Sequence, residues 1–365
     1  VVLLGPVALS FLRMGIDRKG FANKLFWTEL KAGLIVVGVF LTFSLHKSIM
    51  AGHFSFESVM QLFQIIVPFL FTYVLINELS ESDIEKFMKV ALWMTFIGYV
   101  VAVSANFSSF INILSISIFN SYSPFENSTF AEIASGLGAY FIYYRKKMPG
   151  YTIFVVILNL LIFKRVLMLM TLMLLIISLA NKQKEEVSEK LMGAAYIGWP
   201  VLIILFYKLY QPETVQMIIK RFGFDFVTFS TYRIYRLWYV LETDFVSYGL
   251  GSTTEYINSR NLSYLGSEFE MDFVRLLFEL GIIAIIIFVW AYLYITRRNK
   301  YAFWLMNFCF LNLLMANGLL KYWGWTMRLI TIALINYGTE SLNQSKQENN
   351  RISKQIKMKK MRVRL

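Results

Sequence analysis

The chain has 365 residues, 57% of them hydrophobic and only 16% charged, and its mean hydropathy of +0.55 excludes an ordinary soluble domain, which is roughly 25% charged. The net charge of +13 arises from basic residues at the ends of apolar runs and in the C-terminal tail, a placement typical of membrane topology signals rather than of a nucleic-acid surface. A single cysteine, Cys309, and two histidines exclude a disulfide framework and disfavour a metal centre or a histidine-dependent triad.

Apolar runs that suit membrane helices recur along the whole chain, since a spanning helix needs about 20 mostly apolar residues. Eleven are expected, near residues 1–14, 30–46, 59–77, 87–105, 130–145, 149–163, 166–180, 191–209, 272–295, 301–319 and 323–340. Because Val1 is not a methionine and the first run is short, we expect upstream residues, and twelve spans if they add one. Lys164–Arg165 separates two runs, or lies inside one long bent helix.

Alternation of these spans places most of the 36 lysine and arginine residues on one side, which the positive-inside rule makes cytoplasmic. The expected fold is an all-α transmembrane bundle with one long, partly helical extracytoplasmic loop. Its regions are spans one to eight over 1–209, the loop over 210–271, spans nine to eleven over 272–340 and a basic cytoplasmic tail over 341–365. The tail is expected to touch anionic lipid.

The long loop is rich in aromatic residues and in charges of both signs, so we expect it to be folded. Within it, Ser230–Asp244 predicts an amphipathic helix on which Arg233 and Arg236 share a face. Two guanidinium groups at that spacing suit the oxygens of phosphate or pyrophosphate. The alternative is that they pair with Glu242, with Asp244 or with lipid headgroups.

Aromatic residues Tyr232, Tyr235, Trp238 and Tyr239 surround these arginines. They would stack on sugar rings, or they belong to the aromatic belt at the membrane interface. Lys164–Arg165 offers further positive charge. Placing one charge inside a bilayer costs about 2.5–3.5 kcal/mol or more, but the expected topology puts this pair at the outer surface, where snorkelling makes it inexpensive.

Two further patterns follow the arginines. Gly249 and Gly251 allow the backbone to approach an anion closely, or they simply form a turn. Glu268, Glu270 and Asp272 precede the ninth span and are candidates for a general base.

The alternative for the acidic residues is local. Ser267 and Glu270 match the S-x-x-E capping box of a helix. Asp272, Arg275 and Glu279 are spaced for two helical ion pairs, Asp272–Arg275 and Arg275–Glu279.

The order of these features resembles the Wzy-type O-antigen and capsule repeat-unit polymerases, which are similar to the O-antigen ligases. The resemblance covers Arg233–Ile286, including the stretch FELGII over Phe278–Ile283. Ligases carry a histidine eleven residues before the glycine matched by Gly281, where this chain has Glu270, and that difference favours a polymerase.

The resemblance implies a metal-independent glycosyltransferase without a cofactor, acting on undecaprenyl-pyrophosphate-linked oligosaccharides at the outer face of the bacterial cytoplasmic membrane. It implies that arginines hold the pyrophosphate, here Arg233 and Arg236 with Arg165 and Lys164, while Glu270, Asp272 or Glu268 supplies the base. A one-step displacement would invert the anomeric centre. A chain-length regulator and a flippase are the implied protein partners. The competing functions are a ligase, a flippase or transporter for the same lipid, and a non-catalytic scaffold.

Overall fold

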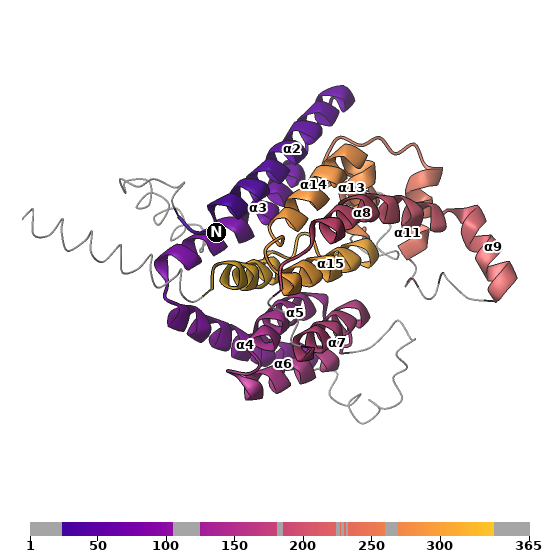
Figure 1. The fold of residues 1–365 in the computed structure, drawn as a ribbon. Coiled ribbons are helices and arrows are strands. Elements are labelled where there is room, and N and C mark those ends of the chain that lie inside the picture. The colour runs from indigo at the N-terminus through magenta and orange to yellow at the C-terminus, as the bar shows by residue number, and fades with distance from the viewer. Residues whose placement is uncertain are drawn as a thin grey trace, which may run out of the picture.

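The computed structural model describes residues 24–104, 125–180, 185–223, 227, 230, 233–259 and 269–338. All regular secondary structure in these residues is helical (Figure 1). The helices are α2 (Trp27–Ala51), α3 (Phe56–Glu78), α4 (Glu81–Val103), α5 (Ser128–Tyr143), α6 (Pro149–Leu161), α7 (Arg165–Leu179), α8 (Glu189–Leu209), α9 (Pro212–Phe222), α11 (Arg233–Glu242), α12 (Ser252–Ser259), α13 (Asp272–Glu279), α14 (Ile282–Tyr294) and α15 (Lys300–Met315). A last helical stretch covers 322–338.

Four of these helices, α2, α3, α4 and α8, are long and apolar enough to cross a membrane, and α6, α7 and α14 are shorter apolar helices. The other expected spans that the structure describes fall on helical segments as well, and the run over 1–14 lies outside the described residues. A helix of 16 residues such as α5 is about 24 Å long, less than the roughly 30 Å of a hydrocarbon core. Full-length spans are therefore observed only for part of the expected set.

Polar caps explain where several helices begin. The Ser80 side chain accepts a hydrogen bond from the Asp83 backbone N–H, and the Asp83 side chain accepts one from the Ser80 backbone N–H, which forms a capping box for α4. Asn127 caps α5 by accepting from the Thr129 and Phe130 backbone N–H groups. These capping residues satisfy N–H groups that have no partner inside the helix.

One expected continuous helix is broken, and the expected break at Lys164–Arg165 is confirmed by the separate helices α6 and α7. The run over 272–295 forms α13 and α14, separated at Gly281, whose φ of 89° is accessible to glycine without a Cβ clash. At Lys164–Arg165 the alternative of one bent helix is wrong, because Phe163 has a φ of 56° and ends the preceding turn. The break at Gly281 leaves Glu279 at the end of α13, and the break at Phe163 leaves Lys164 and Arg165 at the start of α7.

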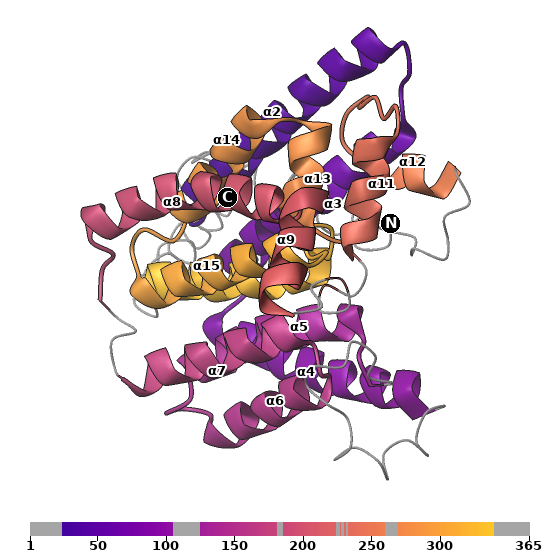
Figure 2. The same cartoon turned by 90° about the vertical axis from the view of Figure 1, so that its right-hand side faces the viewer.

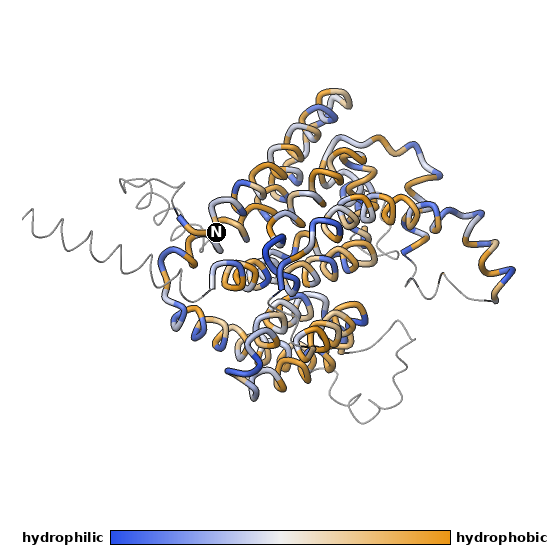
Figure 3. The backbone as a smooth tube through the Cα atoms, viewed as in Figure 1, coloured by the Kyte–Doolittle hydropathy of each residue, from blue (hydrophilic) through white to orange (hydrophobic). Residues whose placement is uncertain are grey.

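The helices pack in two groups. In both views α4, α5, α6 and α7 lie together on one side of α15, while α2, α3, α8, α13 and α14 lie on its other side (Figures 1 and 2). Apolar side chains also face outward, as with Leu34 at 45% and Ile197 at 70% exposure, and Figure 3 shows hydrophobic residues along most helices. An outward apolar surface is what contact with lipid requires.

The long loop contains α9, α11 and α12 and a hydrophobic cluster of its own, so the expectation that it is folded is confirmed for its described part. Ile234, Leu237 and Val240 form the buried face of α11 within this cluster. Phe269 and Met271 join it from the segment that precedes α13. The loop is thereby held against the start of α13.

Candidate functional site

The arginine pair lies on α11, as the spacing predicts. With one face of α11 buried, the Arg233 and Arg236 side chains lie at the edge of the cluster and keep 20% and 11% of their surface exposed. Arg233 Nε donates to Glu270 Oε2 at 2.6 Å, and Arg236 Nη1 lies 3.7 Å from the same oxygen. Both cations therefore converge on one carboxylate.

Glu270 is the anion between the two arginines, whereas Glu242 and Asp244, the partners considered from the sequence, are exposed. Burial by itself would raise the pKa of Glu270, but the charges of Arg233 and Arg236 and the Arg233 hydrogen bond outweigh it and lower this pKa. Glu270 is therefore ionised at neutral pH and is a weak base.

The capping-box interpretation of Ser267 and Glu270 is wrong. Helix α13 begins at Asp272, its N-cap residue is Met271, and no side chain caps it. Glu270 precedes the helix, and its carboxylate is held by arginines from α11. Ser267 and the candidate base Glu268 lie outside the described residues.

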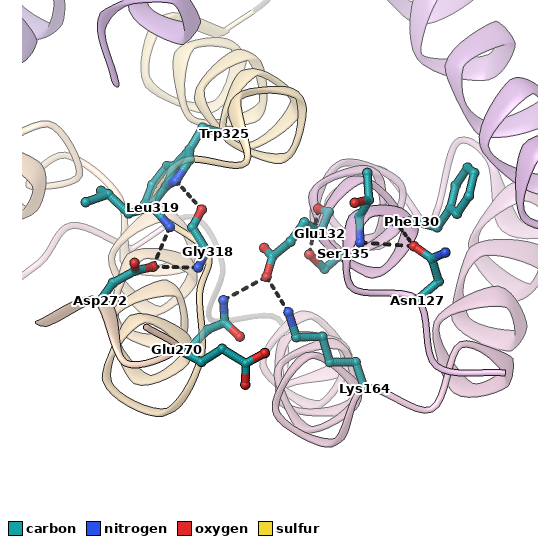
Figure 4. Close-up of polar contacts among 12 residues, drawn as sticks. Asn127, Phe130, Glu132, Ser135, Lys164, Glu270, Asp272, Gly318, Leu319 and Trp325 are labelled. Atoms are coloured by element: carbon teal, nitrogen blue, oxygen red, sulfur yellow. Dashed lines mark hydrogen bonds and ion pairs between the residues drawn. The ribbon is translucent and has the colours of Figure 1, made fainter. Parts of the chain in front are cut away.

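Lys164 does not snorkel at a surface. It is 6% exposed, and its Nζ donates to Glu132 Oε1 at 3.0 Å inside the bundle (Figure 4). Arg328 Nη2 donates to Glu132 Oε2 at 2.5 Å, and Asn312 Nδ2 donates to Oε1 at 2.9 Å. Glu132 is fully buried, so the expected surface position of Lys164 is replaced by a buried network of two cations and one anion.

This network adjoins the arginine site. Figure 4 shows Glu132, Lys164 and Glu270 gathered in one region, with Asp272 on the far side of Glu270 from Lys164. The Lys164 charge also acts to lower the pKa of Glu270, after burial and the two α11 arginines. The partly exposed Arg165 is the first residue of α7, directly after Lys164. The four predicted cations therefore belong to one electrostatic region, in which Lys164 is already engaged.

Three charged residues of this region were not singled out from the sequence. Glu132 and Arg328 stand inside the apolar runs 130–145 and 323–340, and an ionisable residue inside such a run is a signal that could have identified them. Glu126 just before α5 is the third. Glu126 has an exposed surface, but desolvation of its carboxyl group by the surrounding protein raises the pKa of Glu126, and the charges of Lys164, Arg233 and Arg165 offset this only in part.

Asp272 has a structural place. Its Oδ2 accepts from the backbone N–H groups of Gly318 at 2.6 Å and Leu319 at 2.7 Å, and its Oδ1 lies 3.1 Å from Arg275 Nη2. The expected Asp272–Arg275 pair is confirmed. These contacts join the start of α13 to the turn before the last helical stretch, and they occupy the carboxylate considered as a base.

The loop that contains Gly249 and Gly251 does bring backbone N–H groups to an anion, but only Gly251 of the two glycines contributes one, and the anion is a carboxylate of the protein itself. Gly251 N–H donates to Glu279 Oε2 at 2.9 Å, and the Thr253 N–H donates to Oε1 at 3.0 Å. Glu279 thus holds this loop. The expected Arg275–Glu279 pair is accordingly replaced by bonds from the loop, since Arg275 contacts Asp272.

Replacing Gly249 by alanine is expected to lower the free energy of unfolding by about 1–3 kcal/mol. Gly249 has a φ of 114°, and a Cβ there would lie 2.8 Å from Ser44 Cα on α2. Gly193→Ala is the control, because a Cβ on this helical glycine meets nothing within 4 Å. Thermal unfolding in detergent measures both. Equal melting temperatures for the two variants would contradict tight docking of the glycine loop on α2.

The aromatic residues near the arginines differ in exposure and in their contacts. Trp238 Nε1 donates to the Tyr210 carbonyl at 2.8 Å, which fastens α11 to the end of α8. Tyr235 is 42% exposed and its ring lies 5.5 Å from that of Trp238. Tyr235 therefore presents a ring next to the arginines, while Trp238 is mainly structural. Tyr232 lies outside the described residues.

The arrangement has the chemistry of an anion site with a nearby base. A guanidinium carries five N–H donors, and the Glu270 contact uses one of those on Arg233, so an additional oxyanion can be bound. Glu126 offers a carboxylate in the same electric field.

Comparisons with protein-family models, with curated proteins and with solved structures gave no match for this chain.

Proposed function

We propose that this chain polymerises undecaprenyl-pyrophosphate-linked oligosaccharide repeat units into a surface polysaccharide, an O antigen or a capsule. It would do so as a multi-pass protein of the bacterial cytoplasmic membrane, with eleven or twelve spans, an extracytoplasmic loop over 210–271 and a cytoplasmic C-terminus. The observation that carries the proposal is the convergence of Arg233 and Arg236 on the Glu270 carboxylate, in a chain with four membrane-length apolar helices.

In the proposed reaction, a hydroxyl of the acceptor repeat unit attacks the anomeric carbon of the donor's reducing-end sugar. The bond from that carbon to the pyrophosphate oxygen breaks, and undecaprenyl pyrophosphate leaves with the electron pair. Arg233 and Arg236, with Arg165, stabilise the charge that develops on the leaving group. The hydroxyl proton passes to a carboxylate, and attack from the opposite face inverts the anomeric carbon.

Glu126 suits the role of base better than the carboxylates expected from the sequence. Asp272 is occupied by two backbone N–H groups and lies beside Arg275. Glu270 has a lowered pKa and binds both arginines, so we assign it to positioning them. The pKa of Glu126 is raised, and a base is most effective when its pKa approaches the working pH.

The two roles predict different pH profiles for elongation. A base must be ionised, so the wild-type rate falls as the pH drops through the raised pKa of Glu126. In Glu126→Gln the rate is expected to fall roughly 100-fold or more, and the remaining rate should no longer decline at low pH, so the acid limb of the pH profile is lost. In Glu270→Gln the rate also falls, but the limb remains and moves to lower pH, because the Glu270 charge raises the pKa of Glu126. If only Glu270→Gln abolishes the limb, the roles are reversed.

Reconstitution tests the proposed function. The purified chain in liposomes receives a lipid-linked repeat unit, and the products are separated by size. A ladder of products supports polymerisation. A single transfer to a lipid A core would identify a ligase instead, and movement of the lipid across the bilayer without new glycosidic bonds would identify a flippase. Absence of any turnover with an intact, folded chain would favour a scaffold.

A further inference from the structure

A polar cavity of about 160 Å³ lies beside the arginine site. Its lining comes from α3, α12, α13 and the turn over 317–321. Phe269 and Asp272 line it, whereas Glu270, which stands between them in sequence, contacts Arg233. The segment 269–272 therefore separates the cavity from the arginine pair.

Three polar atoms of the lining have no hydrogen-bond or ion-pair partner among the residues that the structure describes. They are Arg275 Nε, Gln61 Oε1 and Gln64 Oε1. Arg275 is 4% exposed and Gln61 is 1% exposed, so bulk water does not serve them. Buried polar groups in folded proteins are nearly always paired, and an unpaired set around one cavity indicates a missing ligand or water.

The missing partner must both donate and accept hydrogen bonds. A hydroxyl can accept from Arg275 Nε while it donates to Gln61 Oε1, whereas the ionised oxygens of a phosphate group only accept and would leave both glutamine oxygens unsatisfied. The lining has no net charge, because the two negative residues, Glu57 and Asp272, balance the two positive ones, Arg275 and Lys321. A neutral polyhydroxylated ligand fits this lining better than an anion does.

We propose that the cavity binds one neutral sugar ring. Its volume is below the roughly 300–1,000 Å³ of sites for drug-sized ligands, which suits a single ring rather than an oligosaccharide. Phe269 supplies an apolar wall, and the polar atoms of Gln61, Gln64 and Arg275 orient the hydroxyl groups. This assignment rests on the proposed function: the donor pyrophosphate would occupy the arginine side of segment 269–272, so the ring in the cavity belongs to the acceptor repeat unit.

Ligand-observed NMR by saturation transfer tests the proposal directly. The full chain is purified in a detergent without a sugar headgroup and titrated with glucose, galactose, N-acetylglucosamine and rhamnose, and separately with inorganic phosphate. At least one neutral sugar is expected to bind saturably, and phosphate is not expected to displace it. Gln61→Leu should weaken that binding roughly two- to tenfold, the effect of one ordinary hydrogen bond, and Gln61→Leu with Gln64→Leu should abolish it.

A matched control is Gln216→Leu on α9, an exposed glutamine outside the cavity, which should bind the sugar as the wild type does. Gln61→Leu removes a buried acceptor without a partner, Oε1, together with the hydrogen bond that Gln61 Nε2 donates to Glu57 Oε1 at 3.0 Å, so the two effects offset each other and its melting temperature should stay close to that of the wild type. Weaker binding in a folded, stable variant therefore cannot be ascribed to unfolding.

The failures of the two proposals are distinguishable. If no neutral sugar binds saturably to the wild type, or if the double variant binds as well, the cavity holds only water and the sugar site is overturned, whatever the elongation assay gives. If sugar binds through Gln61 but reconstituted wild-type protein makes no polymer, the cavity assignment is upheld and polymerisation is overturned. Arg233→Ala should lose elongation while retaining sugar binding.

Discussion

Arg233→Ala and Arg236→Ala are each expected to abolish chain elongation while the protein remains inserted and abundant. Both guanidinium groups lie within reach of one carboxylate oxygen, at 2.6 and 3.7 Å, and both keep exposed surface for a substrate oxyanion. Loss of one positioned charge-stabilising group typically costs 100- to 1,000-fold in rate, about 2.7–4 kcal/mol. Polysaccharide length and in vitro ladders measure the effect.

Conservative and remote substitutions sharpen this result. Arg233→Lys keeps the charge but loses the planar, forked donor geometry, so it should retain only a small part of the activity. Arg221→Ala removes an exposed arginine from the end of α9 and should leave elongation unchanged. Wild-type polysaccharide from both alanine variants of the α11 arginines would refute a pyrophosphate site there.

Glu132→Gln is expected to destabilise the protein by about 3–5 kcal/mol and to reduce its amount in the membrane sharply. Glu132 is completely buried and is the acceptor for both Lys164 and Arg328. Removing its charge leaves two buried cations without compensation, which costs far more than the loss of a surface ion pair. Thermal unfolding in detergent and membrane abundance are the measurements.

Two variants bracket this effect. Glu132→Asp retains the charge on a shorter side chain and should lose less stability than Glu132→Gln. Glu213→Gln alters an exposed glutamate on α9 and should leave the melting temperature unchanged. A Glu132→Gln protein as stable and abundant as the wild type would show that Lys164 and Arg328 do not depend on Glu132.

Contacts distant in sequence show where prediction from local patterns ends. The interpretation of Glu270 as a cap used only its neighbours, but its position is determined by Arg233, which is 37 residues away. Lys164 was expected at the surface because it falls between two predicted spans, but it is buried against Glu132, which is 32 residues away. In both cases packing of separate helices selected the partner.

The sequence by itself determined the helical, lipid-compatible character of the chain and the common face of Arg233 and Arg236, because hydropathy and helical period are local properties. Only the tertiary structure decided which carboxylates are occupied and which are available. Glu279 holds the Gly251 loop, Asp272 holds the turn at Gly318, and Glu270 joins the arginines. A buried charged or polar group needs a partner, and that partner is selected by how the helices pack together.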